Sequence, residues 1–114
     1  MKRKSVAHLD HGLADALDVV GEWWTLLIVW AIKKEACRFE AMHKELGIAR
    51  NILSDRLRTL EEAGVVEKRL YSDKPKRFEY RLTEMGHDLH GTLTELERWG
   101  DTWRRSANAT PRAS

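Results

Sequence analysis

A polar segment near the middle of the chain carries side chains that suit hydrogen bonding to nucleotide bases. Leucines recur at Leu53, Leu57 and Leu60, a spacing that places them on one face of a helix. Polar residues take the other face near its start: Arg50, Asn51, Ser54, Asp55 and Arg58. Arginine can pair with guanine, and asparagine with adenine, in the major groove of DNA. The pattern predicts a recognition helix for double-stranded DNA; its alternative is an ordinary solvated helix face.

A basic segment follows and suits contacts to phosphates. Residues 65–82, which we call the wing, hold six basic and three acidic side chains, a net charge of +3, whereas five basic and five acidic side chains cancel in 38–64. Lysine and arginine bind the DNA backbone without reading its sequence. We expect backbone contacts from Arg56, Lys68, Arg69, Lys74, Lys76 and Arg77. Because Arg56 lies nearer the apolar face of its helix, an internal ion pair is its alternative role.

Cys37 is the single cysteine of the chain. No disulfide can therefore form within the chain, and no cysteine-based zinc site is available. Cys37 stands just before a predicted helix and beside Arg38, and both features favour a thiolate. Cys37 is thus a candidate redox residue, with a buried, inert thiol as the alternative.

The histidines and carboxylates do not form a recognisable metal or catalytic site. His8, Asp10 and His11 cluster near the N-terminus, and His87 and His90 are three residues apart. Neither group has the ligand count and spacing of a closed zinc site. We find no nucleophile with a paired base, no phosphate-binding loop and no paired carboxylates. The sequence predicts no enzyme, no metal and no cofactor.

Hydrophobic periodicity predicts the elements that position these residues. Apolar residues at three- and four-residue spacing favour helices over 12–20, 22–34, 38–46 and 49–63. Alternation of polar and apolar residues then predicts strands over 65–71 and 77–82, joined by turn residues. Thr83 suits the N-cap of a last helix that runs to about Arg105.

The order of these elements predicts a winged helix-turn-helix fold, mainly α with one small β-hairpin. Gly47 lies between two predicted helices, where a glycine adopts positive φ without strain from a Cβ. A helix, a short glycine turn and a second helix form a helix-turn-helix, and the basic hairpin that follows forms the wing. The second helix of such a motif enters the major groove.

Length and composition indicate one globular domain. The 114 residues are 42% hydrophobic and 33% charged, with a net charge of +2. We expect the domain to span 12–105, between a flexible lead (1–11) and a disordered tail (106–114). The most apolar run, 23–32, is about half the ~20 residues needed to cross a bilayer, and no signal-peptide pattern precedes it. These features predict a soluble cytoplasmic protein without a membrane partner.

Six motifs and one glycine, in order, resemble the HxlR-type winged helix-turn-helix regulators. They are Ala16–Gly21, Trp24–Ile28, Arg38–Phe39, Leu53–Glu61, Gly64–Val66, Arg77–Thr83 and Gly86. The resemblance covers roughly residues 11–100. It implies a homodimeric bacterial or archaeal transcription factor, broadly similar in layout to MarR-type regulators. It also implies repression or activation of nearby genes, with electrophiles, oxidants or small molecules as signals in some members.

Two positions depart from the family pattern. Family members that sense thiol chemistry usually carry Cys-Pro ahead of the first helix, where this chain has His11 and Gly12. Ala49 stands where the family often has a serine that caps the recognition helix. Loss of such a cap typically costs ~1 kcal/mol, which a backbone, water or phosphate contact could offset.

The last predicted helix carries an apolar seam with the spacing of a heptad repeat. Large aromatic residues on such a surface often mark an interface. We expect a two-fold homodimer built by this helix and the one at 12–20, through Leu13, Leu17, Leu89, Leu93, Leu96, Trp99 and Trp103. The alternative is packing of the helix on its own domain.

The five tryptophans suggest a candidate pocket for a small-molecule effector. They are Trp23, Trp24, Trp30, Trp99 and Trp103, and plain core or interface packing is the alternative interpretation. A second function also stays open for the whole chain. The zero net charge of 38–64 would suit a winged-helix module that binds protein instead of DNA.

Overall fold

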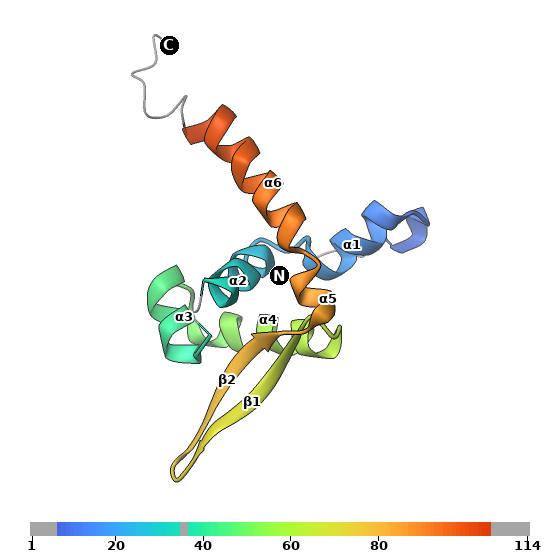
Figure 1. The fold of residues 1–114 in the computed structure, drawn as a ribbon. Helices are drawn as coiled ribbons and strands as arrows, with labels where there is room; N and C mark the ends of the chain where they lie inside the picture. The colour runs from blue at the N-terminus through green and yellow to red at the C-terminus, as the bar shows by residue number, and fades with distance from the viewer. Residues whose placement is uncertain (1–6, 35–36, 106–114) are drawn as a thin grey trace.

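The computed structural model describes residues 7–34 and 37–105 (Figure 1). The predicted tail (106–114) and the first six residues of the predicted lead lie outside this range. In the rest of the lead, Ala7–Leu9 form one 3-10 turn. None of the helices within the described ranges has the length and apolar character that a membrane span needs.

Helix α2 (Thr25–Lys33) lies at the centre of the hydrophobic core. It packs against α3 (Phe39–Leu46), α4 (Arg50–Glu62) and strand β2 (Lys76–Leu82). Ile28 and Val29 are fully buried, as expected for a helix that is apolar nearly all round. The prediction placed the start of this helix at Glu22, but the chain first forms a short turn at 22–24.

The helix-turn-helix is confirmed, and its turn follows the predicted chemistry. Gly47 ends α3 with φ of 67°, and its N–H donates to the carbonyl of His43. Ile48 is fully buried behind the turn, and its carbonyl lies 2.7 Å from Nδ1 of His43. Ala49 precedes α4 with no side-chain cap, as the sequence implied.

The wing is an antiparallel hairpin of β1 (Val66–Asp73) and β2. The expected half-buried alternation along β2 holds only near the body: Leu82 is buried and Tyr80 half-buried, but Phe78 is 40% exposed. The reason is geometric, because the hairpin projects beyond the helices that could cover its outer half (Figure 1). A register shift between Leu70 and Ser72 interrupts the pairing there.

The prediction of one continuous last helix is wrong. Thr83 is the predicted N-cap, and its hydroxyl oxygen accepts a hydrogen bond from the Gly86 N–H. The helix that it caps, α5 (Glu84–His87), is only a single turn. The N–H of Leu89 then donates to the carbonyl of Gly86, three residues earlier instead of the four of an α-helix. After this tighter turn, α6 (His90–Gly100) starts. A π-helical turn, η2 (Asp101–Arg105), continues α6.

Helix α1 (Gly12–Val20) has the predicted bounds. The side chain of His11 caps it by accepting a hydrogen bond from the Ala14 N–H at 3.1 Å. Figure 1 shows α6 and the wing projecting from opposite ends of the body formed by α2, α3 and α4, with α1 on one side. This arrangement places α6 and the wing far from each other.

Gly86 provides a test of the packing between α5 and the residue that precedes β1. A Cβ at this position would lie 2.2 Å from the carbonyl oxygen of Val65, whereas a Cβ on Gly91 in α6 would meet nothing within 4 Å. We expect Gly86→Ala to lower the free energy of unfolding by about 2 kcal/mol or more, since backbone must move. Gly91→Ala should be neutral or stabilise by up to about 1 kcal/mol. Equal effects in urea denaturation would contradict the described contact.

Candidate nucleic-acid interface

The leucine stripe of α4 fixes which of its side chains face outward. Leu53, Leu57 and Leu60 are at most 1% exposed. The opposite face therefore carries the predicted recognition residues: Arg50, Asn51, Ser54 and Arg58 are exposed, and Asp55 is half-buried. The structure thus brings all five onto one side of one helix, beside the wing (Figure 1).

Arg50, the first residue of α4, is held by Glu40 in the first turn of α3. Its Nη2 donates to Glu40 Oε1 at 2.7 Å, and its Nη1 donates to Oε2. Both side chains remain more than half exposed. The hydrogen bond from Arg50 lowers the pKa of Glu40 below its ordinary value, so the carboxylate is charged at neutral pH.

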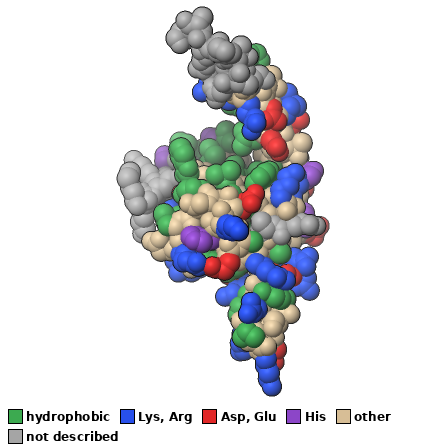
Figure 2. All heavy atoms as spheres, turned by 90° about the vertical axis from the view of Figure 1, so that its left-hand side faces the viewer, with side chains coloured by type: hydrophobic (Ala, Val, Ile, Leu, Met, Phe, Trp, Pro, Cys, Tyr) green, Lys and Arg blue, Asp and Glu red, His purple; other side chains and the backbone are tan. Residues whose placement is uncertain are grey.

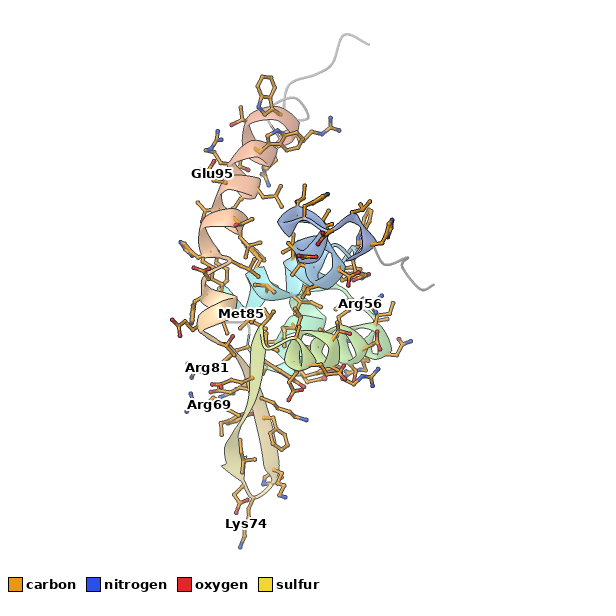
Figure 3. The ribbon with its side chains drawn as sticks, turned by 90° about the vertical axis from the view of Figure 1, so that its right-hand side faces the viewer. Arg56, Arg69, Lys74, Arg81, Met85 and Glu95 are labelled. Carbon is orange, nitrogen blue, oxygen red and sulfur yellow. The ribbon has the colours of Figure 1, made fainter. Side chains whose placement is uncertain are left out.

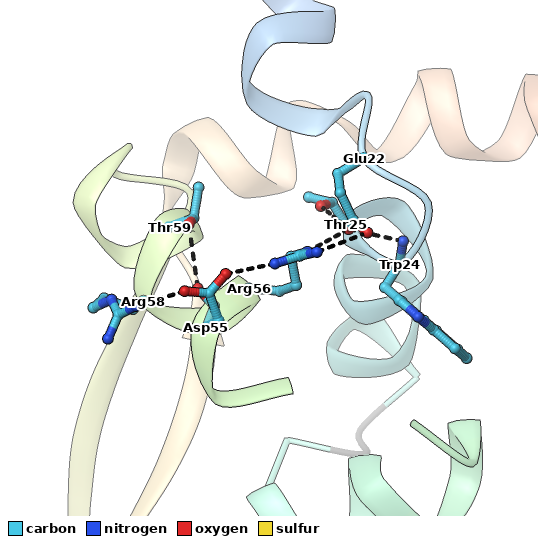
Figure 4. A network of polar contacts seen from close by, with 7 residues as sticks. All are labelled: Glu22, Trp24, Thr25, Asp55, Arg56, Arg58 and Thr59. Carbon is cyan, nitrogen blue, oxygen red and sulfur yellow. Dashed lines mark hydrogen bonds and ion pairs between the residues drawn. The ribbon is translucent and has the colours of Figure 1, made fainter. Parts of the chain in front are cut away.

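Asp55 links the other two arginines of α4 (Figure 4). Its Oδ2 accepts a hydrogen bond from Arg56 and its Oδ1 one from Arg58. Asp55 is therefore engaged within the helix, and the Arg58 side chain remains 66% exposed. All three arginines of α4 are thus paired with carboxylates of the same chain.

Arg56 forms the internal ion pair that the sequence left open as one of its two roles. Its Nε lies 2.6 Å from Glu22 Oε2, and its Nη2 donates to Oε1 at 3.1 Å. Each side chain of this pair is only 21% exposed. Arg56 is directed at the turn before α2 (Figure 4), so it ties the recognition helix to the core helix.

Glu22 is a positioning residue that sequence reasoning missed. Its Oε2 accepts hydrogen bonds from the Trp24 N–H at 3.0 Å and from Thr25 Oγ1 at 3.2 Å, at the start of α2. Burial raises its pKa, but these bonds and those from Arg56 outweigh burial, so the pKa lies below its ordinary value. An acidic residue just before a helix was the available signal.

The predicted backbone-contact residues of the wing are all exposed: Lys68, Arg69, Lys74, Lys76 and Arg77. Figure 3 shows Lys74 at the wing tip and Arg69 projecting nearer the body on the same side as Arg81, and Figure 2 shows Lys and Arg side chains along the length of the wing. Arg81 pairs with Glu79 at 2.9 Å.

Two cation–π contacts involve aromatic side chains of the wing, and the sequence did not indicate them. Lys68 Nζ lies 4.5 Å from the centre of the Phe78 ring, and the Arg38 guanidinium lies 3.9 Å from that of Tyr71. In such contacts the cation lies over the face of the ring and is attracted by its quadrupole. Arg38, just before α3, therefore joins the wing to the helix-turn-helix.

The predicted dimer residues divide into two groups. Leu89 and Leu93 pack in or against the core of the domain itself, which is the alternative considered for this helix. The others are 42–67% exposed: Leu13, Leu17, Leu96, Trp99 and Trp103. Leu9, in the 3-10 turn before α1, is also 50% exposed. An apolar surface thus remains on α1 and the outer part of α6.

Cys37 lies away from the recognition face of α4. It is half-buried, and its Sγ donates to Glu79 Oε2 at 3.8 Å. It borders a pocket of about 360 Å³ that Lys33 and His87 also line. No group of three metal-binding side chains occurs within 7–34 and 37–105.

A second, more apolar pocket of about 390 Å³ lies between α2 and α6. Of the five tryptophans proposed to line an effector site, Trp30 lines this pocket, together with Leu26, Leu27, Leu93 and Leu96. Trp23 is 82% exposed elsewhere. Figure 2 shows hydrophobic side chains gathered on the body below the C-terminal helix.

A helix-turn-helix with an outward polar helix and a cationic hairpin defines a winged helix-turn-helix, the fold of DNA-binding transcriptional regulators. Residues 19–108 match the family model described as HxlR-like helix-turn-helix. The chain belongs to this family.

Relatives and solved structures agree with this assignment. The HTH-type transcriptional regulator Rv3095 of Mycobacterium tuberculosis is 47% identical over 88 residues, which cover 77% of this chain and 56% of the relative. The chain therefore spans about half the length of this relative. The crystal structure of PA1607 is similar, with a TM-score of 0.80, 36% identity and coverage of 89% of this chain and 70% of that one. The reduced form of the transcriptional regulator YodB from B. subtilis has a TM-score of 0.68 at 27% identity, covering 79% and 89%.

The Glu22–Arg56 link predicts a pH-dependent loss of stability on substitution. We expect Glu22→Gln to lower the free energy of unfolding by about 1–2 kcal/mol at pH 7. A carboxyl whose folded pKa is lowered stabilises above its unfolded pKa of about 4.3 and loses this contribution as pH falls through the folded value. The difference from the parent should therefore shrink below about pH 4.

Glu62→Gln is the matched control, because Glu62 is exposed at the end of α4. It should stay within about 0.5 kcal/mol of the parent. Urea titrations at several pH values measure both variants. A Glu22→Gln effect that is absent at pH 7, or that grows as the pH falls, would contradict the role of this pair.

Proposed function

We propose that the protein is a sequence-specific transcriptional regulator that binds double-stranded DNA as a homodimer on a palindromic operator in the cytoplasm. The observation that carries this proposal is the outward polar face of α4 beside the basic wing. The family assignment and the names of its relatives support it. Residues 12–105 would form the functional domain.

The charge distribution divides the work between two elements. The arginines of α4 are paired with carboxylates, so this helix adds little to long-range attraction. The exposed cations of the wing create a net positive field that attracts the phosphates of DNA. In this proposal the wing supplies affinity, and Arg50, Asn51, Ser54, Asp55 and Arg58 supply base discrimination.

A homodimer would cover the apolar surface of α1 and α6. Leu13 and Trp103 are each more than 60% exposed, and large exposed apolar patches usually mark interfaces. A two-fold axis near these helices would place the two α4 helices about one DNA turn, ~34 Å, apart. The apolar pocket beside Trp30 would then be the candidate site of a small-molecule effector, and Cys37 a candidate redox residue.

Two sets of variants separate affinity from specificity. Lys74→Ala combined with Lys76→Ala should weaken binding to all duplexes and reduce the slope of log affinity against log salt by up to about 2, since each phosphate contact contributes about 0.9. Arg58→Glu should instead reduce the preference for the selected site over single-base variants, where each pairing contributes about 1–3 kcal/mol. Fluorescence anisotropy measures both quantities.

The duplexes for this test are a site selected by the parent protein from random sequences and an unrelated duplex of equal length. Variants that bind both duplexes as the parent does would show that the site assignment is wrong. A parent protein that binds neither would overturn DNA binding and favour the protein-interaction module that the neutral 38–64 segment allows.

The tryptophans of α6 and η2 test the dimer. Trp99→Ala with Trp103→Ala should shift the protein from dimer to monomer in sedimentation at micromolar concentration, because these side chains are 53% and 63% exposed before assembly. Trp23→Ala is the control, since Trp23 is also exposed but precedes α2. A parent that sediments as a monomer would remove the homodimer from the proposal.

A further inference from the structure

The ion pair between Glu40 and Arg50 involves a side chain of the surface assigned to DNA. Arg50 opens α4, and Glu40 stands in the first turn of α3, on the other side of the Gly47 turn. Both guanidinium Nη atoms donate to the carboxylate, one to each oxygen. A residue expected to read a base thus already holds a carboxylate of the same chain in the free protein.

We propose that Glu40 is a specificity-determining residue that competes with DNA for Arg50. Its carboxylate occupies the two donors that Arg50 would use for a base or a phosphate. Arg50 can exchange it for a group that offers comparable hydrogen bonds, such as the O6 and N7 acceptors of guanine. This inference rests on the proposed DNA binding.

The exposure of the pair makes such an exchange feasible. Arg50 and Glu40 are 58% and 66% exposed, and ion pairs at this exposure contribute little to stability. The pair can therefore open without disturbing the core. The Glu22–Arg56 pair differs, because its two side chains are each only 21% exposed and it joins α4 to α2.

The carboxylate acts differently on the two kinds of DNA contact. An unpaired arginine is attracted to any phosphate, which raises affinity for all sequences alike. Beside Glu40, the charge of Arg50 is neutralised, so Arg50 adds little attraction for a phosphate. A guanine edge carries no net charge, so neutralisation of Arg50 weakens a contact to guanine less than a contact to phosphate. Glu40 therefore reduces binding to unrelated DNA more than it reduces binding to a matched site.

Glu40→Gln tests the proposal, and Glu45→Gln is its matched control. Glu45 is exposed on the same helix, and no ion pair with another described residue is found for it. Both variants remove one negative charge from α3, but only Glu40→Gln releases Arg50. Anisotropy would measure affinity for a duplex selected by the parent from random sequences and for an unrelated mixed-sequence duplex of equal length.

We expect Glu40→Gln to bind the unrelated duplex severalfold more tightly than Glu45→Gln does, with a salt slope steeper by about 0.9, which corresponds to one added phosphate contact. The ratio of selected-site to unrelated affinity should fall for Glu40→Gln and stay at the parent value for Glu45→Gln. In an Arg50→Gln background, Glu40→Gln should no longer differ from Glu45→Gln. Thermal melts of each variant confirm that it is folded.

The outcomes separate this inference from the function on which it rests. A parent that prefers its selected site, with Glu40→Gln and Glu45→Gln indistinguishable, overturns the role of Glu40 and leaves DNA binding intact. A difference that persists in the Arg50→Gln background also overturns it, because the effect would not pass through Arg50. A parent that binds no duplex overturns both.

Discussion

The burial of the leucine stripe of α4 is the constraint on which the rest of the structure depends. Leu53, Leu57 and Leu60 are inserted into the core beside the fully buried Ile28 of α2. Because a helix that buries one face must expose the opposite one, this packing alone selects the side chains that can meet DNA. The Glu22–Arg56 ion pair adds a polar link between α4 and the start of α2. The packing of the core therefore determines which face of α4 is exposed.

The same packing leads to an unequal distribution of charge. Every arginine of α4 has a carboxylate partner, from Glu40, from Glu22 or from Asp55 within the helix, whereas the wing keeps a net charge of +3. In the proposed function, a neutral α4 beside a cationic wing separates base discrimination from electrostatic attraction. This separation would limit binding to unrelated DNA, since the phosphate-driven part of affinity carries no sequence information.

The local patterns of the sequence were sufficient for the fold class, although not for the break in the last helix. The switch from helical to alternating periodicity located α4 and the wing, and Gly47 and Thr83 indicated a turn and a cap that the structure contains. What the sequence did not reveal depends on contacts between distant residues. Glu22 and Arg56 are 34 positions apart, and no periodicity reports such a pairing. The exposure of Phe78 likewise depends on how far the wing projects beyond the helices.

The central claim is that the polar face of α4 and the wing meet DNA together. Amide spectra of isotope-labelled protein, titrated with a duplex selected from random sequences, test it most directly. The account predicts that the largest changes in amide chemical shift fall on Asn51, Ser54 and the wing tip around Lys74. The amides of α6 should not shift when DNA is added. Changes confined to α1 and α6, with α4 unmoved, would contradict it.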